Sequence, residues 1–125
     1  IVSTAGITPD TRYPWGQCTW WAATRRADIG KPIPGWGNAA TWAGSAASAG
    51  YTVDGSPSAG SVIVFQPGVL GASADYGHVA MVEEVRGDGS ILISESNALG
   101  LGVVSTREIS ASQLAAAGNG VRYIH

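Results

Sequence analysis

The sequence predicts an α+β fold in which N-terminal helices pack on an antiparallel β-sheet. The two long helical patterns lie in the first 50 residues, and runs of β-branched residues dominate the remainder. Short glycine-containing turns separate those runs. Helices followed by consecutive hairpin-linked strands are typical of α+β proteins. The 125 residues, 45% of them apolar, suit one compact domain over residues 1–125, which opens with an irregular segment at residues 1–12.

Two helices are predicted before residue 50. The first covers residues 18–29 and ends at Gly30, where the missing side chain favours a helix stop. The second covers residues 39–49, with Asn38 as its N-cap and a glycine behind it. Tryptophans on both helices are expected to anchor a core: Trp20 or Trp21, and Trp42.

The chain after Gly60 is predicted to form a sheet. The expected strands cover residues 61–65, 78–86, 90–97, 103–109 and 121–124, and a short helical turn is expected at residues 110–114. Gly87-Asp88-Gly89 marks a hairpin turn. Strand alternation places Ile91 and Ile93 on the same face as Glu95, and we expect this apolar face to pack against the helices.

Composition excludes several classes of function. The net charge is −2, the isoelectric point is about 5.5, and no Lys/Arg run provides a nucleic-acid footprint. No apolar stretch approaches the roughly 20 residues that a membrane span needs. One cysteine cannot form an internal disulfide, and one cysteine with two histidines supplies metal chemistry poorly, so we expect no metal and no other cofactor. Further domains are expected to flank this segment in a longer chain.

The single cysteine, Cys18, stands at the start of the first predicted helix. The helix dipole and free N–H groups there stabilise an anion, so they favour a thiolate nucleophile and can hold an oxyanion. A buried cysteine that faces the sheet is the alternative, and position alone fits both interpretations equally.

His78, Glu95 and Asn97 complete a possible site. His78 opens a strand at a loop edge, and the hairpin turn brings it and Glu95 near the same end of the sheet. Each residue alone also fits a structural role: a satisfied histidine, a solvent-facing carboxylate, and a turn asparagine. Together with Cys18 they supply the parts of a thiol hydrolase site. The other histidine, His125, is expected to be exposed.

Several segments resemble the motifs of one family, the CHAP domain (cysteine, histidine-dependent amidohydrolase/peptidase). They run in the family's order from Tyr13 almost to the end of the sequence. These segments are Gly16-Gln17-Cys18-Thr19, Trp36-Gly37-Asn38-Ala39 followed by Trp42-Ala43, Gly77-His78-Val79-Ala80, Glu95-Ser96-Asn97, and the closing Tyr123-Ile124-His125. The ordered set is specific, whereas any one of them would not be.

The resemblance implies a papain-like fold and assigns roles to the residues. Cys18 would be the nucleophile, His78 the general base and Glu95 the group that orients the imidazole. Asn97 would be a further polar member of the site, and Gln17 would help to hold the oxyanion. The family mostly cleaves peptidoglycan, between muramic acid and L-alanine or within the stem or cross-bridge peptide. We therefore expect a peptidoglycan partner and a secreted or cell-wall-associated protein of bacterial or phage origin.

Two features near the cysteine are interpreted separately. Some members of the family bind calcium through an acidic loop before the cysteine, but here that region holds only Asp10, so we predict no calcium site. Trp15 and Trp36 lie in loops beside the cysteine helix and are candidates to line a glycan or peptide groove. Packing is an equally good role for both.

Two other functions compete with wall hydrolysis. A cell-wall-binding module without catalysis would hold purified walls and release no amines. An amidase of a small thiol conjugate would have a tight acidic pocket, whereas a wall hydrolase would have a neutral groove.

Overall fold

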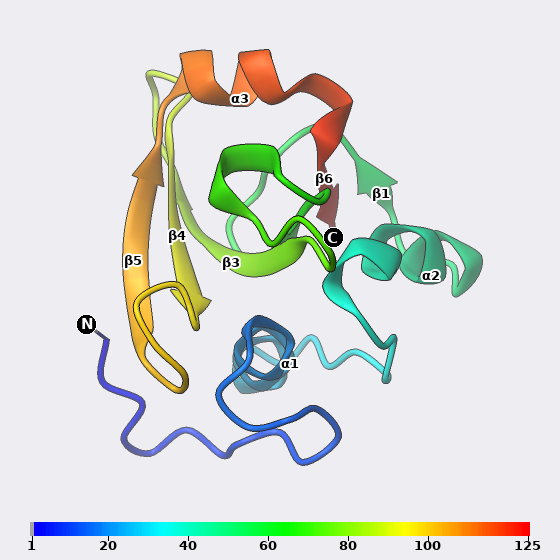
Figure 1. The fold of residues 1–125 in the computed structure, drawn as a ribbon, viewed down its shortest axis with the longest axis vertical. Helices are drawn as coiled ribbons and strands as arrows, with labels where there is room; N and C mark the ends of the chain where they lie inside the picture. Colours follow the sequence, from blue (N-terminus) through cyan, green and yellow to red (C-terminus); the bar gives the residue numbers. More distant parts are fainter. Residues whose placement is uncertain (1) are drawn as a thin grey trace.

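The computed structural model describes residues 2–125 and confirms the predicted α+β class (Figure 1). Six strands form an antiparallel sheet in the order β1-β6-β2-β3-β4-β5. The strands are β1 (Val53–Asp54), β2 (Val62–Phe65), β3 (His78–Val85), β4 (Ile91–Ser96), β5 (Val104–Ile109) and β6 (Val121–Ile124). The α-helices are α1 (Cys18–Asp28), α2 (Trp42–Ser48) and α3 (Ala111–Ala117).

Helix α1 packs against one face of the sheet and forms the larger core there (Figure 1). Trp21 of α1 and Trp42 of α2 are almost completely buried in this core, as predicted from their helical positions. The strand side chains that meet them alternate along the chain: Val62, Val64, Val79, Met81 and Val104. Burial of large aromatic side chains supplies much of the favourable free energy that holds a helix on a sheet.

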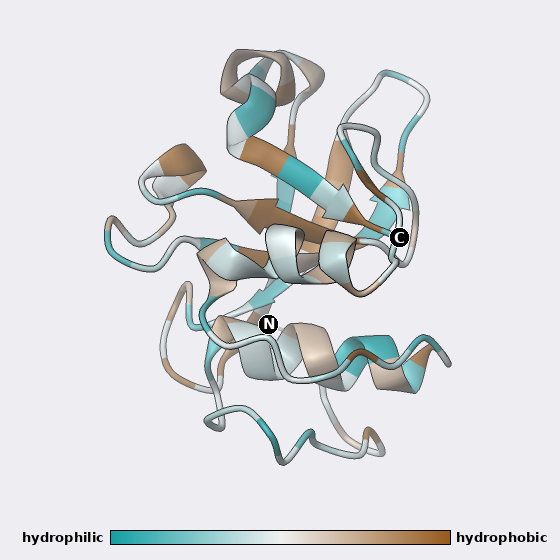
Figure 2. Cartoon of the chain, turned by 90° about the vertical axis from the view of Figure 1, so that its right-hand side faces the viewer, coloured by the Kyte–Doolittle hydropathy of each residue, from teal (hydrophilic) through white to brown (hydrophobic). Residues whose placement is uncertain are grey.

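The opposite face of the sheet carries a second core that the sequence analysis assigned wrongly. Ile91 and Ile93 pack there with side chains from β2, β3 and β6, under α3 and the segment 69–72. The prediction that Ile91 and Ile93 face the N-terminal helices is therefore wrong. Because the central strands are buried on both faces, alternation separates the two faces but does not show which one a given helix covers. Figure 2 shows the hydrophobic strands lying between α1 at the bottom and α3 at the top.

Most predicted elements agree with the structure to within one residue at each end, and the larger differences concern α2, α3 and β1. The second helix begins as a 3-10 turn (Ala39–Thr41), and the Asn38 side chain makes no capping hydrogen bond. Helix α3 runs to Ala117, beyond the predicted 110–114, and a reciprocal capping box of Ser110 and Gln113 stabilises its start. The two-residue β1, which pairs with β6, was not predicted, since two residues show no measurable alternation.

A polar network fixes α1 on the sheet. Arg25 donates from Nε and Nη2 to the two carboxylate oxygens of Glu83, at 3.1 and 2.9 Å. Ser94 on β4 donates to Glu83 at 2.7 Å and accepts from the Trp21 indole at 2.9 Å. Arginine, carboxylate, hydroxyl and indole therefore satisfy one another, and they set the position of α1 along the strands.

The last residue is held against the sheet edge, contrary to the expectation that it would be exposed. The two ring nitrogens of His125 bond to Ser58 Oγ and Asp54 Oδ1, each at 2.7 Å. Its carbonyl oxygen accepts from the Arg26 guanidinium at 3.1 Å. These contacts join β6, the segment after β1 and the end of α1. Within residues 2–125, no helix has both the length and the apolar character needed to cross a membrane.

Gly77 allows β3 to start close to β2. Its φ is +72°, and a Cβ atom there would lie 2.5 Å from the carbonyl oxygen of Phe65. Any side chain would therefore push apart the strand ends that carry Phe65 and His78, which are directly paired.

We expect Gly77→Ala to destabilise the protein more than Gly50→Ala does. Gly50 also has a positive φ, +92°, but no atom lies within 4 Å of its Cβ position, so its substitution measures backbone strain alone. Strain of this kind costs about 1–2 kcal/mol, and the clash at Gly77 adds to it. Urea unfolding midpoints at unchanged slope measure both effects. Equal losses in the two variants would contradict the close approach.

Candidate active site

Cys18, His78 and Glu95 meet where α1 begins. Cys18 and His78 line the same cavity, close enough for each to shift the pKa of the other. His78 Nε2 lies 2.9 Å from Glu95 Oε1, so Nδ1 is the ring nitrogen left to face the sulfur. The Glu95 side chain is only 3% exposed, and that of His78 14%. The three side chains are thus arranged in a row, from a half-buried thiol to a buried carboxylate.

The topology explains why residues so distant in sequence come together. Cys18 is the first residue of α1, and His78 is the first residue of β3. Glu95 lies near the end of β4, which runs antiparallel to β3. The beginning of β3 and the end of β4 therefore lie at the same end of the sheet, and the start of α1 lies against that end.

The environment favours a thiolate and an imidazolium. Burial would raise the pKa of Cys18, but the hydrogen bond and charge of His78 outweigh it, with help from the N–H groups of Val79 and Thr19, and the pKa falls. Burial would likewise lower the pKa of His78, but its interactions with the Cys18 sulfur and the Glu95 carboxylate, which favour the protonated ring, raise it to about 9. The proton therefore prefers the imidazole over the sulfur.

Arg107 on β5 contacts the same carboxylate and was not singled out from the sequence. Its Nε and Nη2 atoms donate to Glu95 Oε2 and Oε1 at 3.0 and 3.1 Å. Burial would raise the pKa of Glu95, but His78 and Arg107 lower it overall. A buried carboxylate needs a cation, which is the one signal that pointed to an arginine. The pairing of β4 with β5, which selects Arg107, is not readable from the sequence.

Asn97 and Gln17 contact each other and not the His78 ring. Asn97 adopts a left-handed conformation with φ of 66° directly after β4. Its Nδ2 atom donates to Gln17 Oε1 at 3.0 Å. This contact orients the Gln17 carboxamide directly before Cys18. It uses the carboxamide oxygen of Gln17 and not the N–H groups.

The loop before Cys18 is fastened to the loop between β4 and β5. The carbonyl oxygen of Gly16 accepts from Ser96 Oγ at 2.8 Å and from the Gly102 N–H at 3.1 Å. A Cβ atom on Gly102 would lie 2.3 Å from the Trp15 ring, so the indole rests directly on this glycine. Trp15 remains 61% exposed beside the site.

Two cavities meet at Cys18. The larger, of about 540 Å³, contains His78, Glu95 and Arg107 with Leu70 and Leu99 in its walls. The smaller, of about 400 Å³, is lined by residues from the loops on the other side, including Arg12, Tyr13, Gly37 and Asn38. The residues common to both are Gln17, Cys18, Tyr76 and Gly77. The thiol therefore lies at the junction of a two-sided groove.

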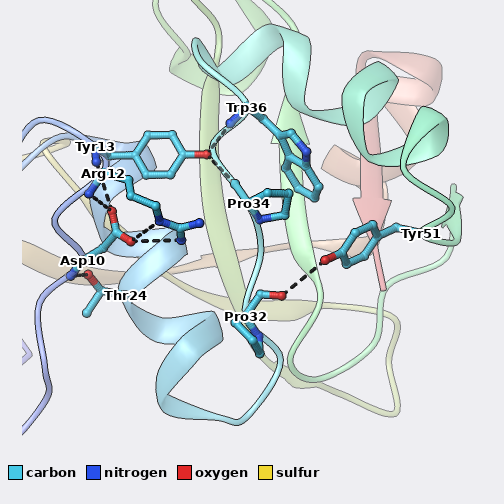
Figure 3. A network of polar contacts seen from close by, with 8 residues as sticks. All are labelled: Asp10, Arg12, Tyr13, Thr24, Pro32, Pro34, Trp36 and Tyr51. Atoms are coloured by element: carbon cyan, nitrogen blue, oxygen red, sulfur yellow. Dashed lines mark hydrogen bonds and ion pairs between the residues drawn. The ribbon is translucent and has the colours of Figure 1, made fainter.

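Tyr13 lines the smaller cavity, and Figure 3 shows its polar contacts together with those of Asp10 on the same loop. The Tyr13 hydroxyl donates to the carbonyl of Pro34 at 3.0 Å and accepts from the Trp36 N–H at 2.7 Å. The side chain of Asp10 is only 8% exposed. It accepts the N–H groups of Arg12 and Tyr13, which fold the loop on itself.

Trp36 lies next to Tyr13. Its ring packs edge-on against Trp42 and Tyr51, with centroids 5.6 and 5.1 Å away. Neither Trp36 nor Trp15, the two tryptophans proposed from the sequence to line a groove, is among the residues that line these cavities. Across residues 2–125 there is also no group of three or more His, Cys, Asp or Glu side chains that could hold a metal ion.

Comparison with known proteins identifies the family. The family model for the CHAP domain matches residues 8–97. The N-acetylmuramoyl-L-alanine amidase sle1 of Staphylococcus aureus is 44% identical over 90% of this chain and 31% of its own length. The probable autolysin SsaALP of the same species is 54% identical over 68% of the chain and 30% of its length.

A solved structure agrees with these matches. The crystal structure of an N-acetylmuramoyl-L-alanine amidase from Staphylococcus aureus superposes with a TM-score of 0.87 at 40% identity, covering 95% of this chain and 33% of that one. The chain thus spans about a third of the length of these relatives. Since the family model matches most of the chain and the fold agrees throughout, the chain belongs to the CHAP domain family.

Proposed function

We propose that this chain hydrolyses amide bonds of bacterial peptidoglycan, with Cys18 as the nucleophile. The observation that carries the proposal is the thiol at a helix start, beside an imidazole that a buried carboxylate holds. Relatives named as N-acetylmuramoyl-L-alanine amidases and an autolysin support this substrate class, and they favour the bond between muramic acid and L-alanine. A cell-wall location, outside the cell, follows from the same substrate.

Acylation begins from the thiolate–imidazolium pair. The sulfur of Cys18 attacks the carbonyl carbon, and the carbonyl oxygen becomes an oxyanion. In this proposal the N–H groups at the start of α1 and the Gln17 carboxamide hold the oxyanion, and Asn97 orients Gln17. The C–N bond then breaks as His78 gives its proton to the leaving amine, which leaves a thioester on Cys18.

Water completes the cycle. His78, now neutral, accepts a proton from water while the hydroxide attacks the thioester carbon. The C–S bond breaks, the acid product leaves, and the thiolate returns beside a protonated imidazole. Glu95 stays ionised throughout and holds His78 Nε2, so that Nδ1 carries the proton in both steps.

The two cavities give the substrate a direction. The leaving amine must lie beside the proton donor, and His78 lines only the larger cavity. The peptide that leaves therefore occupies the side of Leu70 and Leu99, and the acyl part lies on the side of Tyr13 and Asn38. We expect the exposed Trp15 to stack on a sugar ring, whereas Trp36 supports the loop from behind.

The groove favours wall hydrolysis over its two rivals. A pocket for a small thiol conjugate would be closed, but here cavities extend to both sides of Cys18, as a polymer requires. A binding module would not need a thiol whose pKa is lowered by an adjacent imidazole. Mass spectrometry of fragments released from defined peptidoglycan tests the activity and identifies the bond together.

Substitution of either reacting group is expected to abolish lysis. Cys18→Ala and His78→Ala should each lower the release of amines from purified walls by about a thousandfold or more. His125→Ala is the matched control, because that ring bonds only to Ser58 and Asp54 and should affect stability alone. Circular dichroism checks folding. Lysis by folded Cys18→Ala would refute the nucleophile assignment.

Activity should follow the charge of the pair across pH. The lowered pKa of Cys18 keeps the thiolate present below the ordinary thiol range, and the raised pKa of His78 keeps the imidazolium up to about pH 9. We expect lysis to fall above that value, and to fall on the acid side where the thiolate takes up a proton. Iodoacetamide reports the thiolate without background, since Cys18 is the only cysteine. A single midpoint near the ordinary value of about 8.5 would contradict the pair.

Gln17 should contribute to the transition state and not to the thiolate. Gln17→Ala removes an oxyanion donor, so we expect lysis to fall by about a hundredfold. The rate at which iodoacetamide alkylates Cys18 should stay within about twofold of the wild type, since that reaction forms no oxyanion. Parallel losses in both assays would show that Gln17 acts on the thiol instead.

A further inference from the structure

We propose that Arg107 is a positioning residue of the site, which holds Glu95 in the orientation that His78 requires and joins it to the wall of the larger cavity. The inference rests on the proposed function, because it assigns a role within the same reaction. Its evidence is separate: the contacts of the guanidinium with a carboxylate, an aromatic ring and a loop carbonyl.

The contact with Glu95 fixes the plane of the carboxylate. Arg107 binds both oxygens, one through Nε and the other through Nη2. Oε1 is therefore shared between the guanidinium at 3.1 Å and His78 Nε2 at 2.9 Å. A two-point contact resists rotation of the carboxylate, which a single hydrogen bond to His78 does not.

Phe65 supports the arginine and the histidine together. The Arg107 guanidinium lies 5.5 Å from the centre of the Phe65 ring, and the His78 ring centre lies 5.5 Å from the same ring. Phe65 is fully buried and pairs directly with His78 across β2 and β3. The aromatic ring therefore limits the movement of both groups that bind Glu95.

The third contact reaches the substrate side. Arg107 Nη1 donates to the carbonyl oxygen of Leu70 at 2.8 Å. Leu70 has a φ of 50°, a conformation that a leucine seldom adopts, and it lines the larger cavity. One guanidinium thus connects the carboxylate behind the histidine with the loop that would contact the leaving peptide.

The charges of the four neighbouring side chains from Cys18 to Arg107 alternate in sign. Thiolate, imidazolium, carboxylate and guanidinium lie in order from Cys18 to Arg107, and their sum is zero. Loss of the guanidinium would leave Glu95 buried with one partner, and the site with a net negative charge. Both changes favour proton uptake by the site, on the carboxylate and on the thiolate.

The test compares Arg107→Met, Arg107→Lys and Arg86→Met. Arg86 is the matched control, because its side chain is as exposed as that of Arg107 (35% against 36%) and it pairs with Glu108 and Glu84 outside the site. Each variant is assayed for thermal unfolding, for amine release from walls, and for the pH dependence of Cys18 alkylation by iodoacetamide.

Arg107→Met should lower lysis by about tenfold or more and move the acid midpoint of alkylation to higher pH. Arg107→Lys keeps the charge but not the two-point contact, so it should hold the midpoint and still lose lysis. Arg86→Met should match the wild type. Folded Arg107→Met with an unmoved midpoint would overturn the proposal. If that variant does not fold, wild-type lysis by Arg107→Lys overturns it instead.

The alkylation assay needs no peptidoglycan. If the wild type releases no amines but Arg107→Met still moves the alkylation midpoint, the proposed function fails and the role of Arg107 stands. If the wild type lyses walls but the midpoint stays fixed, only the role of Arg107 fails.

Discussion

The ionised state of buried Glu95 is the constraint on which the site depends. A neutral carboxyl would donate a hydrogen bond to His78 Nε2, so the proton of the neutral imidazole would lie on Nδ1. Nδ1 could then no longer accept a proton from Cys18 or from water. Burial alone pushes toward that neutral form, and only the cations on either side oppose it. The order of β3, β4 and β5 brings His78 and Arg107 to the same carboxylate, so the register of the sheet sets the charge of the site.

The position of α1 is the second requirement, and the fold supplies it far from the thiol. Arg25 and Trp21 attach the middle of the helix to Glu83 and Ser94, whereas Cys18 stands free of these contacts at the helix start. A helix dipole lowers a thiol pKa only modestly, and an adjacent imidazolium adds to it. The effect of the imidazolium requires the helix to begin at the end of the sheet where β3 begins.

The sequence identified the reacting groups better than their support. Strand 121–124 and the meeting of Cys18 with His78 and Glu95 follow from turn signals and motif order. The partner of Glu95 could not be predicted, because it depends on the register between β4 and β5, where no tight turn fixes the pairing. The prediction of which sheet face α1 covers was wrong for a related reason, because strands that are buried on both faces show no alternation of apolar and polar residues.

The exposed apolar residues gather around the groove, and their position supports a polymeric substrate. Tyr76 and Leu99 are each more than half exposed and line the larger cavity, and Trp15, also more than half exposed, lies on the loop just before Cys18. Gly16 and Gly102 bring two of these loops into direct contact, which no side chain at either position would allow. An apolar rim kept rigid in water costs stability unless something covers it. A chain of sugars and peptides that passes through the groove from one cavity to the other would cover that rim while presenting one amide to Cys18.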